Sequence, residues 1–194
     1  MTLIRVNPAS VQQYGREAQT AFDQMHQSLV ELVGDVVAVR YFGPNAVAFK
    51  SECGRLAADF AGRLHLDMAA MADAVRRSTS NIATALGGQP LHLGVDARPI
   101  QPPAPEVVDF VDVDTAALEA VVPVRVRRFG ELRQQLTSNF QRLQATDWEG
   151  HAKLAAVDAV GGFTTSARQT CDLAEQSLCD VIRRQVQAVV AADR

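Results

Sequence analysis

The chain has 194 residues, of which 47% are hydrophobic and 21% are charged, a globular composition that excludes a disordered protein. The net charge is −3 and arises in residues 87–113, because residues 1–86 and residues 114–194 each carry as many basic as acidic side chains. Neither of these neutral parts is basic enough to attract a nucleic acid, so we expect no nucleic-acid partner.

No apolar run approaches the roughly 20 residues that a membrane-spanning helix needs. Residues 1–5 also lack the charged start and the long apolar stretch of a signal peptide. We therefore expect no membrane span and synthesis in the cytoplasm. The three cysteines should be free, buried side chains. Cys171 and Cys179 lie eight residues apart on one predicted helix, about 12 Å, which is too far for a disulfide.

The first predicted helix begins at Asn7-Pro8, a capping residue followed by a first-turn proline. Apolar residues then recur at every seventh position from Val11 to Val39, with a second series between them. One side of a helix of about 30 residues is therefore apolar. The segment 41–44, Tyr-Phe-Gly-Pro, ends the pattern, because glycine allows backbone angles that other residues resist and the residue before a proline disfavours helix.

A second amphipathic helix is predicted from about Pro44 to Leu86, and the short turn makes it antiparallel to the first. Gly87-Gly88 provides the stop. Residues 87–113 contain five of the eight prolines and no helical period, so we expect a semi-extended linker.

The third predicted helix begins at Asp114-Thr115, and a turn at Trp148-Glu149-Gly150 separates it from the last helix. Pro123 lies inside the third helix, where it removes a backbone hydrogen bond. We therefore expect the regular helix to start near this proline, with the turns after Asp114 set apart from it.

The chain aligns with itself at a separation of 107 residues. This offset places Asn7 on Asp114 and Gly43 on Gly150, so the arm from the capping residue to the turn is 36 residues long in both halves. A duplicated helix-turn-helix unit is the simplest explanation. The matched apolar pairs are Val11 and Leu118, Phe22 and Phe129, Met25 and Leu132, Leu29 and Leu136, Val36 and Leu143, Leu56 and Phe163, Met71 and Leu178, Val75 and Ile182, and Ile82 and Val189.

These patterns predict an all-α protein in which two long helical hairpins, residues 1–86 and residues 114–194, pack as a four-helix bundle. The arrangement would be a pseudo-dimer within one chain, joined by the linker 87–113. A lone hairpin exposes its apolar stripe, and covering about 1,000 Å² of it contributes on the order of 25 kcal/mol before entropy costs. The sequence leaves open whether the second hairpin runs parallel or antiparallel to the first.

The turn Trp148-Glu149-Gly150 between two long amphipathic helices resembles the Trp-x-Gly turn of the WXG family. These small helical hairpins are exported by type VII (ESX) secretion systems of actinobacteria and related bacteria, usually as dimers. The resemblance covers both halves, without the linker, and implies a tandem fusion of two Esx-like subunits. The first half has Tyr-Phe-Gly at residues 41–43, so an aromatic residue and the glycine are kept but the tryptophan is not.

The resemblance implies a non-enzymatic, secretion-associated protein that acts through helix-face contacts with other proteins, as a substrate or co-substrate. Family members commonly carry a Tyr-x-x-x-Asp/Glu export signal after the second helix. The tyrosines here, Tyr14 and Tyr41, are followed four residues later by Ala18 and Asn45, so neither supplies the signal. Two expectations follow: secretion through a type VII system with a signal-bearing partner, or a cytosolic role as a chaperone or immunity-like partner of a secreted effector.

No residue pattern for catalysis, cofactor binding or metal binding is present, so we expect no enzyme, no cofactor and no metal site. The histidines His26, His65, His92 and His151 are scattered along the chain, and we expect them to be independent, solvated surface residues.

The basic run 125–128 is expected to be a solvated helix face, with contact to an acidic partner as the alternative. Arg125 and Asn139 occupy apolar-stripe positions, where polar residues usually fix the register or lie at the rim of a bundle.

The candidate partner contacts are the turn residues. For Trp148 and Tyr41 two interpretations stand side by side: an aromatic cap on the end of the bundle, or a contact with a partner. Gly43 and Gly150 are expected to have a conformational role, since a tight turn explains both. The full set is Tyr41, Phe42, Gly43, Trp148 and Gly150.

Overall fold

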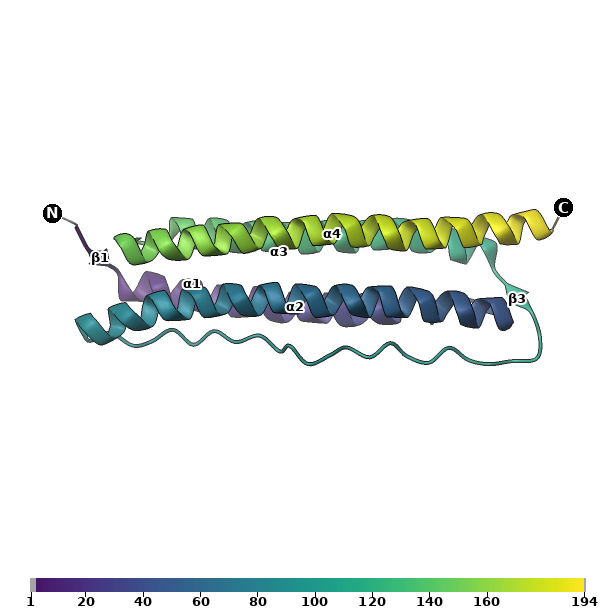
Figure 1. Cartoon of the computed structure of the whole chain (residues 1–194), viewed down its shortest axis with the longest axis horizontal. Helices are drawn as coiled ribbons and strands as arrows, with labels where there is room; N and C mark the ends of the chain where they lie inside the picture. Colours follow the sequence, from purple (N-terminus) through teal and green to yellow (C-terminus); the bar gives the residue numbers. More distant parts are fainter. Residues whose placement is uncertain (1–2, 194) are drawn as a thin grey trace. The chain divides into compact units, whose positions relative to one another are not determined.

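The computed structural model describes residues 3–193, and within this range the fold is all-α with four long helices, as the sequence predicts (Figure 1). Four strands of two residues each were not expected. In chain order the elements are β1 (Arg5–Val6), α1 (Pro8–Gly34), β2 (Tyr41–Phe42), α2 (Pro44–Leu86), β3 (Asp112–Val113), α3 (Thr115–Ala145), β4 (Trp148–Glu149) and α4 (His151–Ala192).

Side-chain caps start α1 and α3 at the predicted residues. The Asn7 Oδ1 accepts hydrogen bonds from the amides of Ala9 and Ser10, at 3.1 and 3.3 Å. The Asp114 Oδ1 accepts one from the amide of Ala117 at 2.9 Å. These oxygens satisfy amides that have no partner within the helix, so the chain enters each helix at a defined residue.

Two predicted helix boundaries need correction. α1 ends at Gly34, several residues before the predicted end near Val39, and residues 35–40 form turns and bends. α3 begins at Thr115 and continues through Pro123, so the expected start near this proline is wrong. The turns before Pro123 are held by the Asp114 cap and by burial of Leu118, which offset the one hydrogen bond that the proline cannot make.

The chain forms two compact units, each built from parts of all four helices. Unit 1 comprises Met1–His26, Leu64–Ala97 and Arg133–Gln169, and unit 2 comprises Gln27–Arg63, Arg98–Leu132 and Thr170–Arg194. Each unit is a four-helix bundle around its own core. In unit 1 the buried side chains include Phe22, Met25, Leu64, Met68, Met71 and Val160, and in unit 2 they include Leu29, Leu32, Phe60, Leu118, Phe129, Leu178 and Ile182.

Polar contacts settle how α1 runs relative to α3 inside unit 1. Ser10 Oγ accepts a hydrogen bond from the Asp147 amide at 3.0 Å, Glu17 pairs with Arg142 at 3.5 Å, and the Gln24 side chain accepts one from Gln135 at 3.0 Å. Residue numbers therefore rise along α1 as they fall along α3. The two helices are antiparallel, a choice that the sequence left open.

The short strands join the start of one half of the chain to the turn of the other. In unit 1, β1 pairs antiparallel with β4, with Arg5 opposite Glu149 and Val6 opposite Trp148. The adjacent amide of Asn7 donates to the carbonyl of Asp147 at 2.8 Å. This backbone pairing fixes the register of the apolar stripes beside it.

Unit 2 contains the same arrangement at an offset of 107 residues. β2 pairs antiparallel with β3, with Tyr41 opposite Val113 and Phe42 opposite Asp112. The amide of Asp114 donates to the carbonyl of Arg40 at 2.9 Å.

Two lysines hold the chain where α1 and α3 end. The Lys50 Nζ donates to the carbonyls of Val37 and Val39, at 2.9 and 2.8 Å. The Lys153 Nζ donates to the carbonyls of Gln144 and Thr146, at 2.8 and 2.7 Å. The accepting carbonyls are repeat-equivalent although the lysines are not, so each half satisfies the orphan carbonyls after its helix with a differently placed ammonium group.

Residues 88–97 of the linker are in neither helix nor strand, and this first part packs on α1 in unit 1. Leu91 and Leu93 are buried. Leu91 fills the space beside Gly15, where a Cβ would lie 2.1 Å from the leucine Cδ1. The Gly94 amide donates to Gln19 Oε1 at 2.9 Å.

The basic run 125–128 does not form the expected solvated face. Arg127 is exposed, but Arg128 is half-buried in unit 2 and pairs with Glu31 and with Asp35, the latter at 2.7 Å. Glu31 of α1 and Asp35, in the turn directly after it, therefore make the contacts that an acidic partner was expected to make.

Arg125 lies in the core of unit 2 with no exposed surface, and none of its guanidinium nitrogens has a hydrogen-bond partner among the described residues. Asn139 is equally buried in unit 1. Its side chain meets the buried Tyr14 hydroxyl, and this contact opposes the rise that burial causes in the Tyr14 pKa. The rim position that we considered for both is wrong. They occupy the stripe positions that Ala18 and Leu32 fill in the first half, so the helix carries them inward.

We expect Arg125→Met to raise the free energy of unfolding by about 1–4 kcal/mol, because it replaces a desolvated, unpaired charge with an apolar side chain of similar length. Burial already lowers the pKa of Arg125, in line with the cost of charge at this position. Urea denaturation measures the change, and Arg127→Met, on the exposed face, is the control expected within about 0.5 kcal/mol of wild type. A destabilised Arg125→Met would show that the core needs the guanidinium.

Candidate functional site

Trp148 is the central residue of the predicted motif, and it is buried in unit 1. It lies in β4 opposite Val6, two residues before α1 begins. Its indole Nε1 has no hydrogen-bond partner among the described residues. Packing against the end of the bundle therefore explains most of the burial of Trp148. Another molecule can reach only the pocket beside it.

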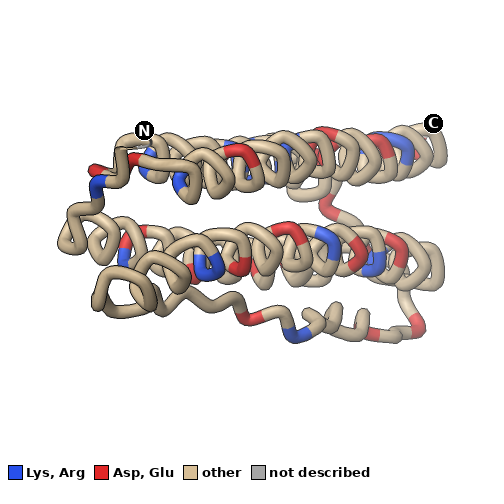
Figure 2. The backbone as a smooth tube through the Cα atoms, turned by 60° about the vertical axis from the view of Figure 1, so that its left-hand side comes forward, with Lys and Arg blue, Asp and Glu red and all other residues tan. Residues whose placement is uncertain are grey.

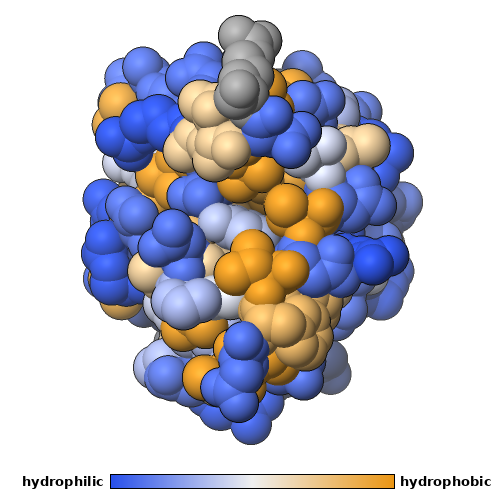
Figure 3. Space-filling model, turned by 90° about the vertical axis from the view of Figure 1, so that its right-hand side faces the viewer, coloured by the Kyte–Doolittle hydropathy of each residue, from blue (hydrophilic) through white to orange (hydrophobic). Residues whose placement is uncertain are grey.

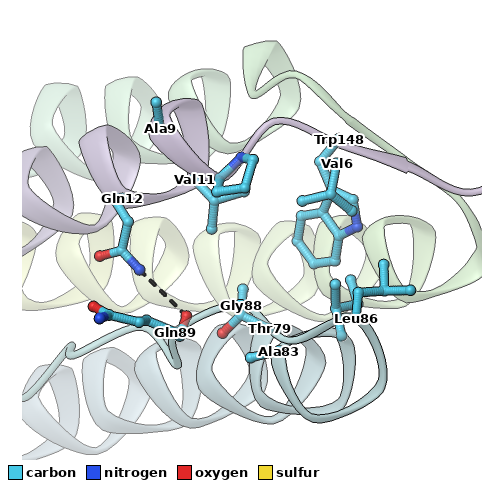
Figure 4. A pocket seen from close by; sticks show the side chains of 12 residues that line it. Val6, Ala9, Val11, Gln12, Thr79, Ala83, Leu86, Gly88, Gln89 and Trp148 are labelled. Atoms are coloured by element: carbon cyan, nitrogen blue, oxygen red, sulfur yellow. Dashed lines mark hydrogen bonds between the residues drawn. The ribbon is translucent and has the colours of Figure 1, made fainter.

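That pocket has a volume of about 420 Å³ and lies entirely in unit 1. Trp148 and Val6 form one wall, the first turns of α1 form another, and the end of α2 closes it (Figure 4). The one hydrogen bond drawn across it joins the Gln12 side chain to the carbonyl of Gln89, at 3.4 Å. The lining residues are Val6, Pro8, Ala9, Val11, Gln12, Thr79, Ile82, Ala83, Leu86, Gly88, Gln89 and Trp148.

Tyr41 occupies the corresponding place in unit 2. It is buried, its ring centroid lies 5.9 Å from that of Phe49, and its hydroxyl accepts a hydrogen bond from Gln185 Nε2 at 2.7 Å. Burial raises the pKa of this hydroxyl, and the bond from Gln185 partly opposes the rise. Phe42, its neighbour, is half-buried against Phe110 and under the Lys50 ammonium group, which lies 5.0 Å from the ring centroid.

A second pocket, of about 700 Å³, lies beside Tyr41 within unit 2. Hydrophobic side chains gather on the face of the molecule where α4 reaches its C-terminal end (Figure 3). The lining residues are Tyr41, Phe42, Gly43, Pro44, Asn45, Ala46, Val111, Val113, Thr115, Gln185, Ala188, Val189, Val190, Ala192 and Asp193.

The two pockets are repeat-equivalent. Six residues of the first become lining residues of the second when 107 is added or subtracted, although the aromatic residue and the pocket volume differ. The equivalent pairs are Val6 and Val113, Pro8 and Thr115, Ile82 and Val189, Ala83 and Val190, Leu86 and Asp193, and Trp148 and Tyr41.

Exposed apolar residues adjoin each glycine of the turns. In unit 1, Leu3 and Ile4 are exposed next to Gly150, and in unit 2, Phe110 and Val111 are exposed next to Gly43. These pairs are again 107 residues apart. Each turn therefore combines a buried aromatic residue, an apolar pocket and an exposed apolar pair.

The ion pairs at the two turns have opposite polarity. In unit 1, Arg5 of the leading strand pairs with Asp147 of the turn at 3.6 Å. In unit 2, Asp112 of the leading strand pairs with Arg40 of the turn at 2.8 Å. Elsewhere both signs of charge are spread along the helices (Figure 2). Each turn thus combines apolar side chains with an ion pair.

We expected all four histidines to be independent surface residues, and for two of them this is wrong. His92 and His151 are exposed, but His65 is buried and its Nε2 lies 3.1 Å from the Nδ1 of His26. This pair is 39 residues apart in the sequence, which is why spacing alone missed it. Among the described residues no group of three or more His, Cys, Asp and Glu side chains is placed to hold a metal ion.

All three cysteines are buried and none is in a disulfide, as expected. Burial is the main cause that raises the pKa of the Cys53 thiol, to about 12, so the group remains a neutral thiol at physiological pH.

Within the part of the chain that is described, no helix has the length and hydrophobicity that crossing a membrane requires. No protein-family model matches the chain, and no curated protein or solved structure is significantly similar to it. The interpretation of the turns therefore depends on their own residues.

Sequence reasoning identified the turns but missed the leading strands β1 and β3 that complete them. Two-residue strands give no periodic signal. The available clue was the offset itself, since Val6 and Val113 precede the capping residues by one position in both halves.

Gly43 and Gly150 have φ values of +119° and +125°, a region that other residues rarely adopt. We expect Gly43→Ala and Gly150→Ala each to lower the free energy of unfolding by about 1–3 kcal/mol, as urea denaturation would measure. Gly62→Ala is the matched control: this glycine lies inside α2 with open space around it, so alanine should stabilise by up to about 1 kcal/mol. Unchanged stability at both turns would contradict the conformational role.

Proposed function

We propose that the chain is a non-enzymatic, protein-binding component of a type VII secretion locus, a fused WXG-like pair that acts through its surface as a substrate or co-substrate. The observation that supports this proposal is the recurrence of the aromatic turn. Each half contributes one turn with an apolar pocket and an exposed apolar pair, and the two sets match at an offset of 107 residues.

The physical argument concerns what such a surface can bind. An apolar pocket with one ion pair at its edge gains free energy by burying an apolar side chain of a partner. The described residues that line the two pockets are mostly apolar side chains. Recognition of a protein segment is the activity that this combination favours.

The test compares culture filtrate with cytosol in the native host, with and without the secretion ATPase. We expect the chain in the filtrate only when the ATPase is present. Equal filtrate levels in both strains, together with no binding to secretion components, would count decisively against the proposal.

The pockets provide a second, sharper test. Ala83→Trp fills the pocket beside Trp148, and Val190→Trp fills the equivalent pocket beside Tyr41. We expect at least one of them to reduce recovery of the secretion partner about tenfold or more in a pull-down, because the partner loses a buried side chain. Ala155→Trp adds the same ring at an exposed position of α4 that lines neither pocket, and should bind like wild type. Unchanged recovery with both pocket variants would exclude these pockets as the contact.

A second candidate is a cytosolic chaperone or immunity-like partner of a secreted effector. The positions of the two tyrosines favour it, because both are buried and neither begins a Tyr-x-x-x-Asp/Glu signal. Recovery of one stoichiometric effector from the cytosol, with none of the chain in the filtrate, would favour this candidate over export.

A further inference from the structure

His26 and His65 join α1 to α2 within unit 1. The Nδ1 of His26 and the Nε2 of His65 are 3.1 Å apart, and the ring planes are within 19° of each other with centroids 5.1 Å apart. An N–H···N hydrogen bond fits this geometry when one of the two nitrogens carries a proton and the other accepts it.

The hydrogen bond between the rings depends on how many of the two facing nitrogens carry a proton. When both rings are in the positively charged imidazolium form, both facing nitrogens are N–H donors. The hydrogen bond is then lost, and two positive charges lie in contact. Water cannot easily screen this repulsion, because His65 is only 2% exposed and its other nitrogen, Nδ1, has no partner among the described residues.

The surroundings do not compensate a second charge. Burial is the largest cause that lowers the pKa of His65, and the neighbouring His26 lowers it further. Asp96 of the linker opposes the shift without reversing it. Among the described residues, the charged groups that act on His65 are thus His26 on α1 and Asp96 in the linker, and none from α3 or α4 is among them.

The direction of the pH effect follows from the lowered pKa of His65. Below its ordinary value of 6.5, the unfolded chain binds a proton that the folded chain resists. The stability provided by neutral His65 is therefore complete above about pH 6.5 and is lost as the pH falls towards the lower, folded-state value.

We propose that the His26–His65 pair is an acid-sensitive latch between α1 and α2 of unit 1, closed while one of the two facing nitrogens carries a proton and opened when acid adds a proton to the other. The opening weakens the contact between these two helices where the linker also packs. The inference is independent of the proposed function, since it requires only the two rings and their burial.

The test measures urea denaturation of the full chain between pH 7.5 and pH 5 for wild type and His65→Leu. We expect the folded-to-unfolded ratio of wild type to fall by up to about tenfold more per pH unit below pH 6.5 than that of the variant, which has lost the titrating ring. His92→Gln and His151→Gln, at exposed positions, should keep the wild-type pH profile. Parallel profiles for wild type and His65→Leu would overturn the proposal.

A measurement on the unmodified protein covers the case in which His65→Leu fails to fold. In an NMR titration, the His65 ring should titrate below pH 6.5, and amides of α1 and α2 near the pair should lose exchange protection before those of α3. Titration of His65 at or above pH 6.5 would overturn the latch.

Discussion

Burial of the apolar stripe along each long helix is the interaction on which the rest of the structure depends. Side chains such as Leu29, Met25 and Leu64 are fully buried because other helices of the same unit cover them. Burial of this kind is strong but non-directional, so a uniform stripe alone would tolerate a shift of one helix along another. The short strands specify the register of the helices, since their backbone hydrogen bonds allow only one pairing at each turn.

The ion pairs at the two turns favour pairing of the first half of the chain with the second half over pairing with a copy of itself. In unit 1 the leading strand provides the arginine, and Arg5 pairs with Asp147 of the turn. In unit 2 the turn provides it, and Arg40 pairs with Asp112 of the leading strand. Pairing the first half with a copy of itself would bring Arg5 to Arg40, two like charges. Exposed pairs of this kind contribute little free energy, but like charges in the alternative pairing favour the arrangement of unlike halves.

Some departures from the repeat lie in the core, where they are costly. The second half places Arg125 and Asn139 at positions that Ala18 and Leu32 occupy in the first, and the Arg125 guanidinium has no hydrogen-bond partner among the described residues. The first half carries the His26–His65 contact. Buried polar groups lower stability but distinguish one helix face from another, so the duplicated halves are not interchangeable.

The sequence by itself determined the helices, the capping residues, the glycine turns and the duplication. These features depend on local periodicity and on backbone freedom, which neighbouring residues set. Only the tertiary structure decided that β1 and β3 close the turns, that Lys50 and Lys153 hold the helix ends, and that His26 meets His65. Residues far apart in the sequence make these contacts, and a one-dimensional pattern does not encode which of them meet. The burial of Arg125 belongs to the same group. The sequence places it on the apolar stripe, but only helix packing decided that it lies in the core and not at the rim.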